Sequence, residues 1–429
     1  MATVTRRIGL SLGADICWPI AYEEILRLLD LSIPIDGGSV GFEVERVTIE
    51  PFDLRHPNRY DLIIDRLTHW YTSSREWIKK AVIMDGVYVF NNPWAIQSME
   101  KQTSYCAMMR LGLPIPDTWL VPPKEYEQTP DLKPTLERYA RLFDLDDIGD
   151  RLGYPMYMKP YDGGGWIGVS RIDDAAALRA AYEQSGRHVM HLQRAVEPHD
   201  LFVRLVGLGP QVRPVLYDPG APLHDRYTRQ VGFLDADDRD LLLDIVLTIN
   251  AFFGWDFNSC EALRGEAGRW YPIDFANPCP DSQVTSLHYH FPWLIKASLR
   301  WSIFCAAVRR RKALNLDWAP YYEIADSDRS YREKLAAYAA IALESFEADR
   351  FEEFCATHLA HLDEVAHDWF AGEEARSAVR KKVVALYPED EVDEFTELFW
   401  SRIQEYREQE PPGADTHGLV TASGRESGA

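Results

Sequence analysis

The sequence is short of positive charge and lacks any long uncharged apolar run. Lys and Arg number 46 against 67 Asp and Glu, giving a formal net charge of −21. Such a surface repels phosphate backbones and anionic lipids, so we expect neither general nucleic-acid binding nor membrane binding. No stretch reaches the roughly 18 apolar residues of a membrane span. The N-terminal run is interrupted by Asp15 and reads as a strand rather than a signal peptide. These features predict a cytoplasmic protein.

Cysteine pairs are also missing. The six cysteines are scattered without a CxxC spacing, which favours buried reduced thiols over a zinc site. The N-terminal region, residues 1–95, contains neither GxGxxG nor GxxxxGK[ST], so it has neither a dinucleotide fingerprint nor a Walker loop. Apolar residues nevertheless make up 46% of the chain and aromatic residues 12%, enough for a large core. A length of 429 residues suggests about three domains or subdomains.

The N-terminal part alternates apolar runs with helical patterns. This is typical of an open α/β sheet, which we assign to residues 1–95. Strands are predicted at 8–14, 42–49, 60–65 and 88–91, with a helix at 22–29 and another at about 95–111.

The middle of the chain, residues 96–310, mixes strands and helices. Polar helical sequence fills 120–150, and helices are predicted near 175–185 and at 238–253. Strands are expected at 156–159, 167–172, 188–193, 257–263 and 270–275, with a hairpin of 201–208 and 211–217.

The C-terminal part is wholly helical in pattern over residues 311–410. An apolar stripe at helical spacing predicts a core face rather than a haem or cofactor site; it comprises Phe351, Phe354, His358, Leu362, Val365 and Trp369. Residues 411–429 are small and polar, which predicts a disordered tail. We therefore expect an α/β protein with a C-terminal helical region.

The strongest local signal is YPMYMKPYDGGGWIGVSRI. A strand ends on Lys159, three glycines form the turn, and a second strand returns. Glycines let backbone N–H groups approach phosphate oxygens closely, and the lysine adds a fixed positive charge. A glycine-rich hairpin beside a surface lysine is the alternative. The three glycines are Gly163, Gly164 and Gly165.

Further segments occur in the order typical of one superfamily. NNPWAIQSMEKQTSYCAMMRLGLPIPDTW, the glycine hairpin, HLQRAVEPHDLFVRLVGLG and GWDFNSCEAL…WYPIDFANPCPD together resemble the ATP-grasp superfamily. The likeness covers residues 60–300, and its nearest branch contains glutathione synthetases and RimK-like ribosomal-protein glutamate ligases. It implies an α+β ATP-grasp domain over 96–310, with subdomains at about 96–192 and 193–310.

The resemblance also implies residues that bind ATP. Lys101 and Lys159 would face the nucleotide, with Lys159 also catalytic, and Arg66 would stand at the mouth of the preceding strand. Hinge residues Gln193, Ala195 and Val196 would bind the adenine edge, and Glu197 would replace the acid usual at Arg194. Asp200 would reach the ribose, and Arg204 would face the phosphates or an acyl phosphate as a catalytic residue.

Two acidic strands supply candidate Mg²⁺ ligands. Mg²⁺ takes oxygen ligands and shares its shell with nucleotide phosphates. The resemblance assigns this role to Glu261, Asp274 and Asn277. The superfamily usually reads acid-x-Asn, whereas this chain is one residue longer, so a bulge, Asp281 or water would complete the shell. An ordinary hairpin with exposed acids is the alternative.

The implied activity is an ATP-dependent ligase that joins a carboxylate to an amine through an acyl phosphate, with release of ADP and phosphate. ATP and Mg²⁺ would be the cofactors and small-molecule or peptide substrates the partners; homo-oligomerisation stays open. A small-molecule kinase is one alternative, because IDF resembles a kinase metal site, but the His-x-Asp-x-x-x-x-Asn loop is missing. A non-catalytic ATP-binding scaffold is the other.

Three further groups have weaker predictions. His288 and His290 are placed at strand spacing on one face, with packing or substrate hydrogen bonding favoured over zinc. The basic run 309–312 is expected to cap a helix C-terminus rather than bind nucleic acid. Arg226 and Arg229 would bind an acidic substrate or form surface salt bridges.

Overall fold

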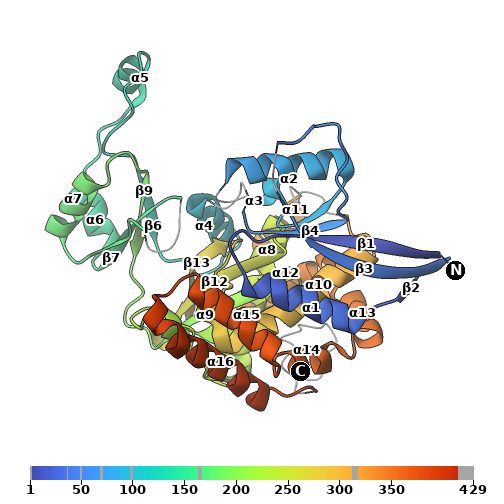
Figure 1. Ribbon diagram of the computed structural model, residues 1–429. Coiled ribbons are helices and arrows are strands. Elements are labelled where there is room, and N and C mark those ends of the chain that lie inside the picture. Colours follow the sequence, from blue (N-terminus) through green and yellow to red (C-terminus); the bar gives the residue numbers. More distant parts are fainter. Residues whose placement is uncertain are drawn as a thin grey trace. The chain divides into compact units, whose positions relative to one another are not determined.

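The computed structural model describes residues 2–35, 37–48, 51–67, 71–96, 100–162, 167–311 and 317–413. The chain divides into two compact units. The first comprises Met1–Gln97, Val203–Cys260 and Asn277–Ala429, and the second comprises Ser98–Phe202 and Glu261–Ala276. Both units combine helices and sheets (Figure 1), so the predicted mixed α/β class is confirmed.

A five-stranded sheet forms the N-terminal part of the first unit. Its order is β2-β3-β1-β4-β5, with β1 parallel to β3 and β4, and β2 antiparallel at the edge. Strand β4 is buried along its whole length, as expected for a strand covered on both faces. The strands are β1 Ala2–Ser11, β2 Ile33–Ile35, β3 Gly38–Arg46, β4 Leu62–Asp65 and β5 Tyr88–Phe90.

Helices cover this sheet on both faces (Figure 1). Helices α1 (Cys17–Leu29) and α10 (Phe291–Ala307) pack against its strands on one side. On the other, Ile78 and Ala81 of α2 (Thr72–Asp85) pack on Ile63. The open α/β arrangement predicted for the N-terminal residues is therefore confirmed.

The rest of the first unit is largely helical. The apolar stripe predicted for the C-terminal region is divided between α13 and α14, and its residues Phe351, Leu362 and Trp369 are buried as a core face. Residues 414–429 of the predicted tail lie outside the described residues. The main helices are α8 Ala236–Phe253, α11 Ala319–Ala325, α12 Tyr331–Ser345, α13 Ala348–His358, α14 Leu362–Trp369, α15 Glu373–Val384 and α16 Val392–Gln409.

The second unit is built on an antiparallel four-stranded sheet of order β6-β9-β7-β8. Its strands are β6 Thr118–Val121, β7 Met156–Pro160, β8 Ser170–Ile172 and β9 Met190–Arg194. Met156, Met158 and Leu192 form its apolar face with α6 (Leu145–Leu152) and α7 (Ala175–Gln184). The other helices of the unit are α4 Lys101–Arg110 and α5 Leu132–Tyr139.

A third sheet has the order β11-β10-β12-β13. The hairpin predicted for its first two strands is confirmed, with Val203 paired to Leu216 and Leu208 to Gln211. The strands are β10 Leu201–Leu208, β11 Gln211–Leu216, β12 Phe257–Arg264 and β13 Trp270–Asn277.

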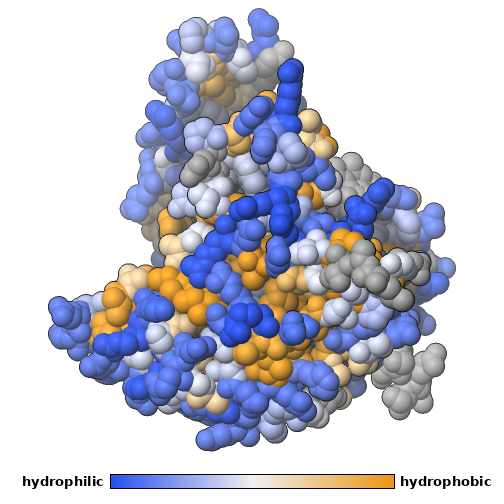
Figure 2. Space-filling view, turned by 45° about the vertical axis from the view of Figure 1, so that its right-hand side comes forward, coloured by the Kyte–Doolittle hydropathy of each residue, from blue (hydrophilic) through white to orange (hydrophobic). Residues whose placement is uncertain are grey.

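The face of the molecule drawn in Figure 2 is mostly hydrophilic. In the face drawn in Figure 2, hydrophilic side chains cover most of the area and apolar ones gather in smaller patches between them. Among the described residues, no helix combines the length and apolarity that a membrane crossing requires.

Candidate functional site

One face of the second unit's sheet buries polar side chains. Successive residues of a strand point to opposite faces, so Met158 and Leu192 enter the apolar core while their neighbours face the other way. Lys159 is paired in register with His191. Lys159, His191 and Gln193 are 8%, 1% and 4% exposed. A buried polar face of this kind is the strongest candidate site in the second unit.

The Lys159 ammonium donates its hydrogen bonds to neutral groups. Its Nζ donates to Gln193 Oε1 at 2.7 Å and to the Ile273 carbonyl at 3.4 Å. It also lies 5.3 Å from the ring centre of Tyr105. The Tyr105 hydroxyl donates to the same Ile273 carbonyl, and Gln193 Nε2 donates to Thr118, so these partners are themselves held in place.

Burial lowers the pKa of Lys159 to about 8. The nearby Asp274 and Glu261 carboxylates act to raise it, whereas Lys101 acts to lower it further. A buried cation is costly unless it is paired, and the groups that hold this one are a neutral amide and a carbonyl. The site is therefore electrostatically suited to an anionic ligand.

Lys101 and His191 add to this cluster. Lys101 is the first residue of α4 and is 9% exposed. Burial lowers the pKa of His191 to about 4, with Lys159 and Lys101 contributing, so its ring is neutral at physiological pH. Neither ring nitrogen of His191 has a hydrogen-bond partner among the described residues. The cluster therefore carries positive charge on its two lysines alone.

Glu261 and Asp274 lie on the adjacent strands β12 and β13. Glu261 is 7% exposed and Asp274 is half-buried, and both carboxylates act on the pKa of Lys159. Their oxygens are the ligand type that Mg²⁺ prefers, and Mg²⁺ commonly takes one or two carboxylates plus substrate phosphates. Among the described residues no group of three or more His, Cys, Asp or Glu could hold a metal. A Mg²⁺ site at Glu261 and Asp274 stays a prediction.

The predicted hinge residues are engaged with the protein. Ala195 N–H donates to the Pro155 carbonyl, and Val196 carbonyl accepts from His199. Asp200 is paired with Arg264 through both oxygens, at 2.9 and 2.6 Å. Glu197, the suggested replacement acid, is held by both terminal nitrogens of Arg171. Roles for these residues in adenine or ribose binding stay predictions.

Arg204 and Asn277 belong to the first unit. The Arg204 guanidinium donates to Ser259 Oγ through Nε and Nη2, at 3.3 and 3.1 Å. It lies 5.8 and 5.5 Å from the ring centres of Tyr217 and Tyr227, within the range of a cation–π contact. Asn277 N–H donates to Asn258 Oδ1 at 2.8 Å. Its part in metal binding stays a prediction.

Comparison with known proteins gives relatives of one kind. No family model matches the chain. A D-alanine–D-alanine ligase of Dechloromonas aromatica (strain RCB) is 25% identical over 157 residues, 34% of this chain and 51% of that protein. A second one, from Heliobacterium modesticaldum (strain ATCC 51547 / Ice1), is 31% identical over 107 residues, 24% of this chain and 28% of that protein. The chain thus spans about half of the first relative and under a third of the second.

Among solved structures, a RimK domain ATP-grasp protein from Sphaerobacter thermophilus DSM 20745 aligns with a TM-score of 0.43 and 14% identity. The alignment covers 64% of this chain and 92% of that one. A likeness of this extent leaves the substrates of the chain open.

Arg66, which the ATP-grasp resemblance places at a strand mouth, sits directly after β4 in the first unit. Its Nη2 donates to the Pro280 carbonyl at 2.7 Å, and its Nη1 lies 3.7 Å from Asp15 Oδ2. Burial raises the pKa of Asp15, while Arg66 and Lys382 act to lower it. The Arg66 guanidinium is therefore partly held by a buried carboxylate at the carboxyl edge of the parallel strands.

The strand assignment for His288 and His290 is wrong, because both lie in a 3-10 turn, η3 (His288–His290). His288 Nε2 contacts the His224 carbonyl and His290 Nε2 the Thr228 carbonyl, at 2.7 and 2.8 Å. Aromatic residues and Pro292 around them continue into a buried helix rather than a sheet. Both side chains are buried and bonded to backbone carbonyls, which agrees with the packing alternative. Substrate hydrogen bonding stays a prediction.

The remaining basic groups form internal contacts. Arg310 follows α10, and its backbone N–H donates to the Cys305 carbonyl in the last turn of that helix, at 2.9 Å. Its side chain bonds Glu347, the Ser345 carbonyl and Tyr88. Arg226 donates to the Ala221 carbonyl, and Arg229 is ion-paired. All six cysteines are free, four of them buried.

Sequence reasoning missed Tyr105 and His191 as parts of the Lys159 site. Signals for both were present. Tyr105 lies one helical turn after Lys101, and His191 alternates with Gln193 along β9. The glycines Gly163, Gly164 and Gly165 lie outside the described residues.

Proposed function

We propose that the protein is an ATP-dependent ligase that joins a carboxylate to an amine through an acyl phosphate, with release of ADP and phosphate. The observation that carries the proposal is the buried Lys159 ammonium, which has neutral hydrogen-bond partners and lies within the electrostatic reach of Lys101, Glu261 and Asp274. Two cations beside two carboxylates match a phosphate chain with its metal. Relatives that are named ligases support the same reaction class.

In this proposal the second unit binds the nucleotide. Lys159 and Lys101 bind phosphate oxygens, while Gln193 holds the Lys159 ammonium in place. Glu261 and Asp274 would hold Mg²⁺, with Asn277 or water completing its shell. The metal would neutralise charge on the transferring phosphoryl group. Because Tyr105 and Gln193 fix Lys159 before ATP arrives, little reorganisation is needed on binding.

The chemistry then follows in two balanced steps. A carboxylate oxygen forms a bond to the γ-phosphorus while the bond to the ADP oxygen breaks. The amine nitrogen next attacks the acyl carbon, phosphate leaves, and the nitrogen loses a proton. Arg204, whose guanidinium lies beside the rings of Tyr217 and Tyr227, would stabilise the oxygens of the acyl phosphate.

The nature of the nucleotide product tests the proposal. With the correct carboxylate and amine, ADP and phosphate should form, and hydroxylamine should trap the acyl phosphate as a hydroxamate. A panel of amino acids and other carboxylates supplies the candidate substrates. AMP and pyrophosphate would overturn the ligase. A phosphorylated alcohol without amide product would favour a kinase, and ATP binding without turnover would favour a scaffold.

A further inference from the structure

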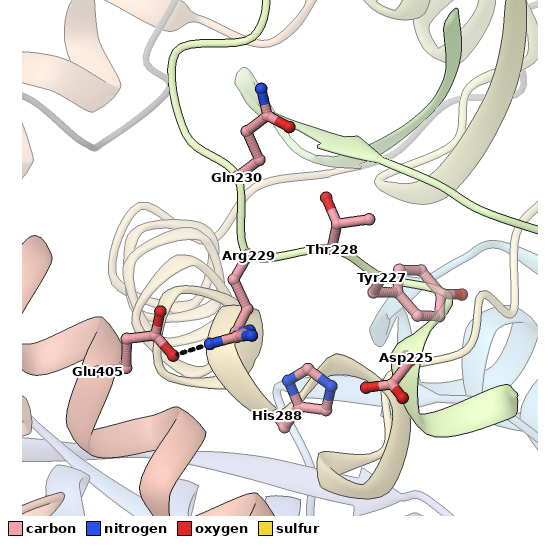
Figure 3. A pocket seen from close by; sticks show the side chains of 7 residues that line it. All are labelled: Asp225, Tyr227, Thr228, Arg229, Gln230, His288 and Glu405. Atoms are coloured by element: carbon pink, nitrogen blue, oxygen red, sulfur yellow. Dashed lines mark hydrogen bonds and ion pairs between the residues drawn. The ribbon is translucent and has the colours of Figure 1, made fainter. Parts of the chain in front are cut away.

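A polar pocket in the first unit has no role in the scheme above. It is built from three separate stretches: the loop after β11 with its turn η1 (Leu223–Asp225), the turn η3, and helix α16 of the C-terminal region (Figure 3). The lining residues are Asp225, Tyr227, Thr228, Arg229, Gln230, His288 and Glu405. All of them offer polar atoms, so the pocket suits a polar ligand.

Arg229 and Glu405 form an ion pair in one wall of this pocket, and Arg402, which does not line the pocket, lies beside that pair. Arg229 Nη1 lies 2.5 Å from Glu405 Oε2, and the same oxygen lies 3.7 Å from Arg402 Nη1. Two guanidinium groups therefore share one carboxylate, and one unit of positive charge stays uncompensated within this trio. That excess favours an anionic group of a ligand at Arg229.

The opposite wall carries negative charge. Asp225 is half-exposed, and its carboxylate lies 3.5 Å from the ring of His224. Figure 3 shows His288 between Asp225 on one side and Arg229 on the other. Asp225 acts to raise the pKa of His288, whereas Arg402 and Arg229 act to lower it. Both signs of charge therefore act across the same small space.

His288 itself adds no charge at neutral pH. Burial lowers its pKa to about 4. Its Nδ1 accepts from Tyr289 N–H at 2.7 Å, its Nε2 donates to the His224 carbonyl, and its ring stacks on Phe399. The imidazole is thus held in one orientation and lines the pocket as a neutral group between Asp225 and Arg229.

Two hydroxyl-bearing residues, Tyr227 and Thr228, also line the pocket. Thr228 Oγ1 is buried without a hydrogen-bond partner among the described residues, so it can bond a ligand that reaches it. Tyr227 lines the pocket and also lies under the Arg204 guanidinium. The pocket therefore adjoins a residue to which the proposed function gives a catalytic role.

We propose that this pocket binds a free α-amino acid as a zwitterion. The ammonium group lies at Asp225, and the carboxylate lies at Arg229 with the Arg402 charge behind it. Helix α16 then has a function, because it contributes Glu405 to the pocket lining and places the Arg402 charge behind it. The identification of this amino acid as a substrate of the ligase rests on the proposed function. The binding of an amino acid in this pocket does not depend on the proposed function.

The test is calorimetry on the full-length protein without nucleotide. The probes are the twenty common amino acids together with the N-acetyl and the amide form of each. At least one free amino acid should bind about 10-fold or more tightly than both of its blocked forms, since each blocked form lacks one charge-assisted contact. Asp225→Asn should abolish the preference over the N-acetyl form, and Arg229→Gln the preference over the amide. Asp237→Asn, an exposed acid on α8, is the matched control.

The outcomes separate this proposal from the ligase. If no free amino acid binds, or if a blocked form binds equally well, the pocket is not a zwitterion site. The same conclusion follows if Asp225→Asn and Asp237→Asn behave alike. Amino-acid binding with the expected variant pattern but without ATP turnover would uphold the pocket and overturn the ligase.

Discussion

Each of the two units buries a cationic side chain, Arg213 in the first and Lys159 in the second, and the two have different hydrogen-bond partners. Arg213 of β11 donates to Glu410 through both terminal nitrogens and to His290 Nδ1 through Nε. Lys159 of β7 donates to an amide and a carbonyl. Both residues are 8% exposed. The difference between them is therefore one of partners rather than of burial.

The pKa shifts run in opposite directions for this reason. Burial acts to lower the pKa of Arg213, and the Glu410 carboxylate with nearby tyrosines reverses that effect, so the pKa ends above its usual value. For Lys159 the neighbouring carboxylates do not reverse the effect of burial. Removing the partner of a buried ion pair is strongly destabilising, whereas a buried charge held by neutral groups is available to a charged ligand.

The largest effect should come from breaking the satisfied pair. Glu410→Ala leaves the Arg213 guanidinium buried and without its carboxylate, which should lower the free energy of unfolding by about 3–5 kcal/mol. Urea unfolding followed by circular dichroism measures this change.

The matched control is Asp393→Asn, which breaks the exposed pair with Arg380 and should cost less than about 1 kcal/mol. Equal losses for the two variants would show that burial does not separate these pairs.

Lys159→Ala should leave the fold unaffected and lower the affinity for ATP. The fold should stay intact, because the change removes a desolvated charge, while ATP affinity should fall by about 3 kcal/mol, or more than 100-fold. Titration calorimetry with ATP and Mg²⁺ measures the affinity, and circular dichroism monitors the fold. Unchanged affinity in a folded variant would remove Lys159 from the nucleotide site.

Substitution of the two carboxylates beside Lys159 should lower turnover more than substitution of the Asn277 amide. Glu261→Gln and Asp274→Asn should each lower Mg²⁺-dependent turnover about 100-fold, because they remove charge that holds the ion. Asn277→Ala should lower it less than about 10-fold. Steady-state rates over a range of Mg²⁺ concentrations make the comparison. Should Asn277→Ala prove the most damaging, the assignment of the metal ligands is incorrect.

Much of the fold could be predicted from local patterns. The N-terminal strands, the 201–217 hairpin and the helices 175–184 and 236–253 follow from apolar periodicity that burial then enforces. His288 and His290 were misassigned because their alternation imitates a strand, whereas the run after them forms a wholly buried helix. Periodicity gives no help where every face of an element is covered.

The candidate site was predictable only in part. Lys159, Glu261 and Asp274 follow from motif order, and the electrostatic coupling among them agrees with that expectation. Pairings such as Arg213 with Glu410, nearly 200 residues apart, leave no local trace in the sequence. The contribution of α16 to the pocket around Arg229 could not be predicted from the sequence for the same reason.

The smallest expected effect is a pH dependence that reports the Lys159 environment directly. Its pKa is about 8 in the folded protein against a usual 10.5, so between these values the unfolded chain binds more protons. The Lys159 contribution to the free energy of unfolding must therefore rise as the pH increases from about 8 to 10.5. Lys159→Met lacks this titration, so it should exceed the wild type in stability at pH 7 by a margin that shrinks toward pH 10. Urea unfolding of both proteins at pH 7, 8, 9 and 10 measures the margin. A constant margin would mean that Lys159 keeps its ordinary pKa and is not prepared for phosphate.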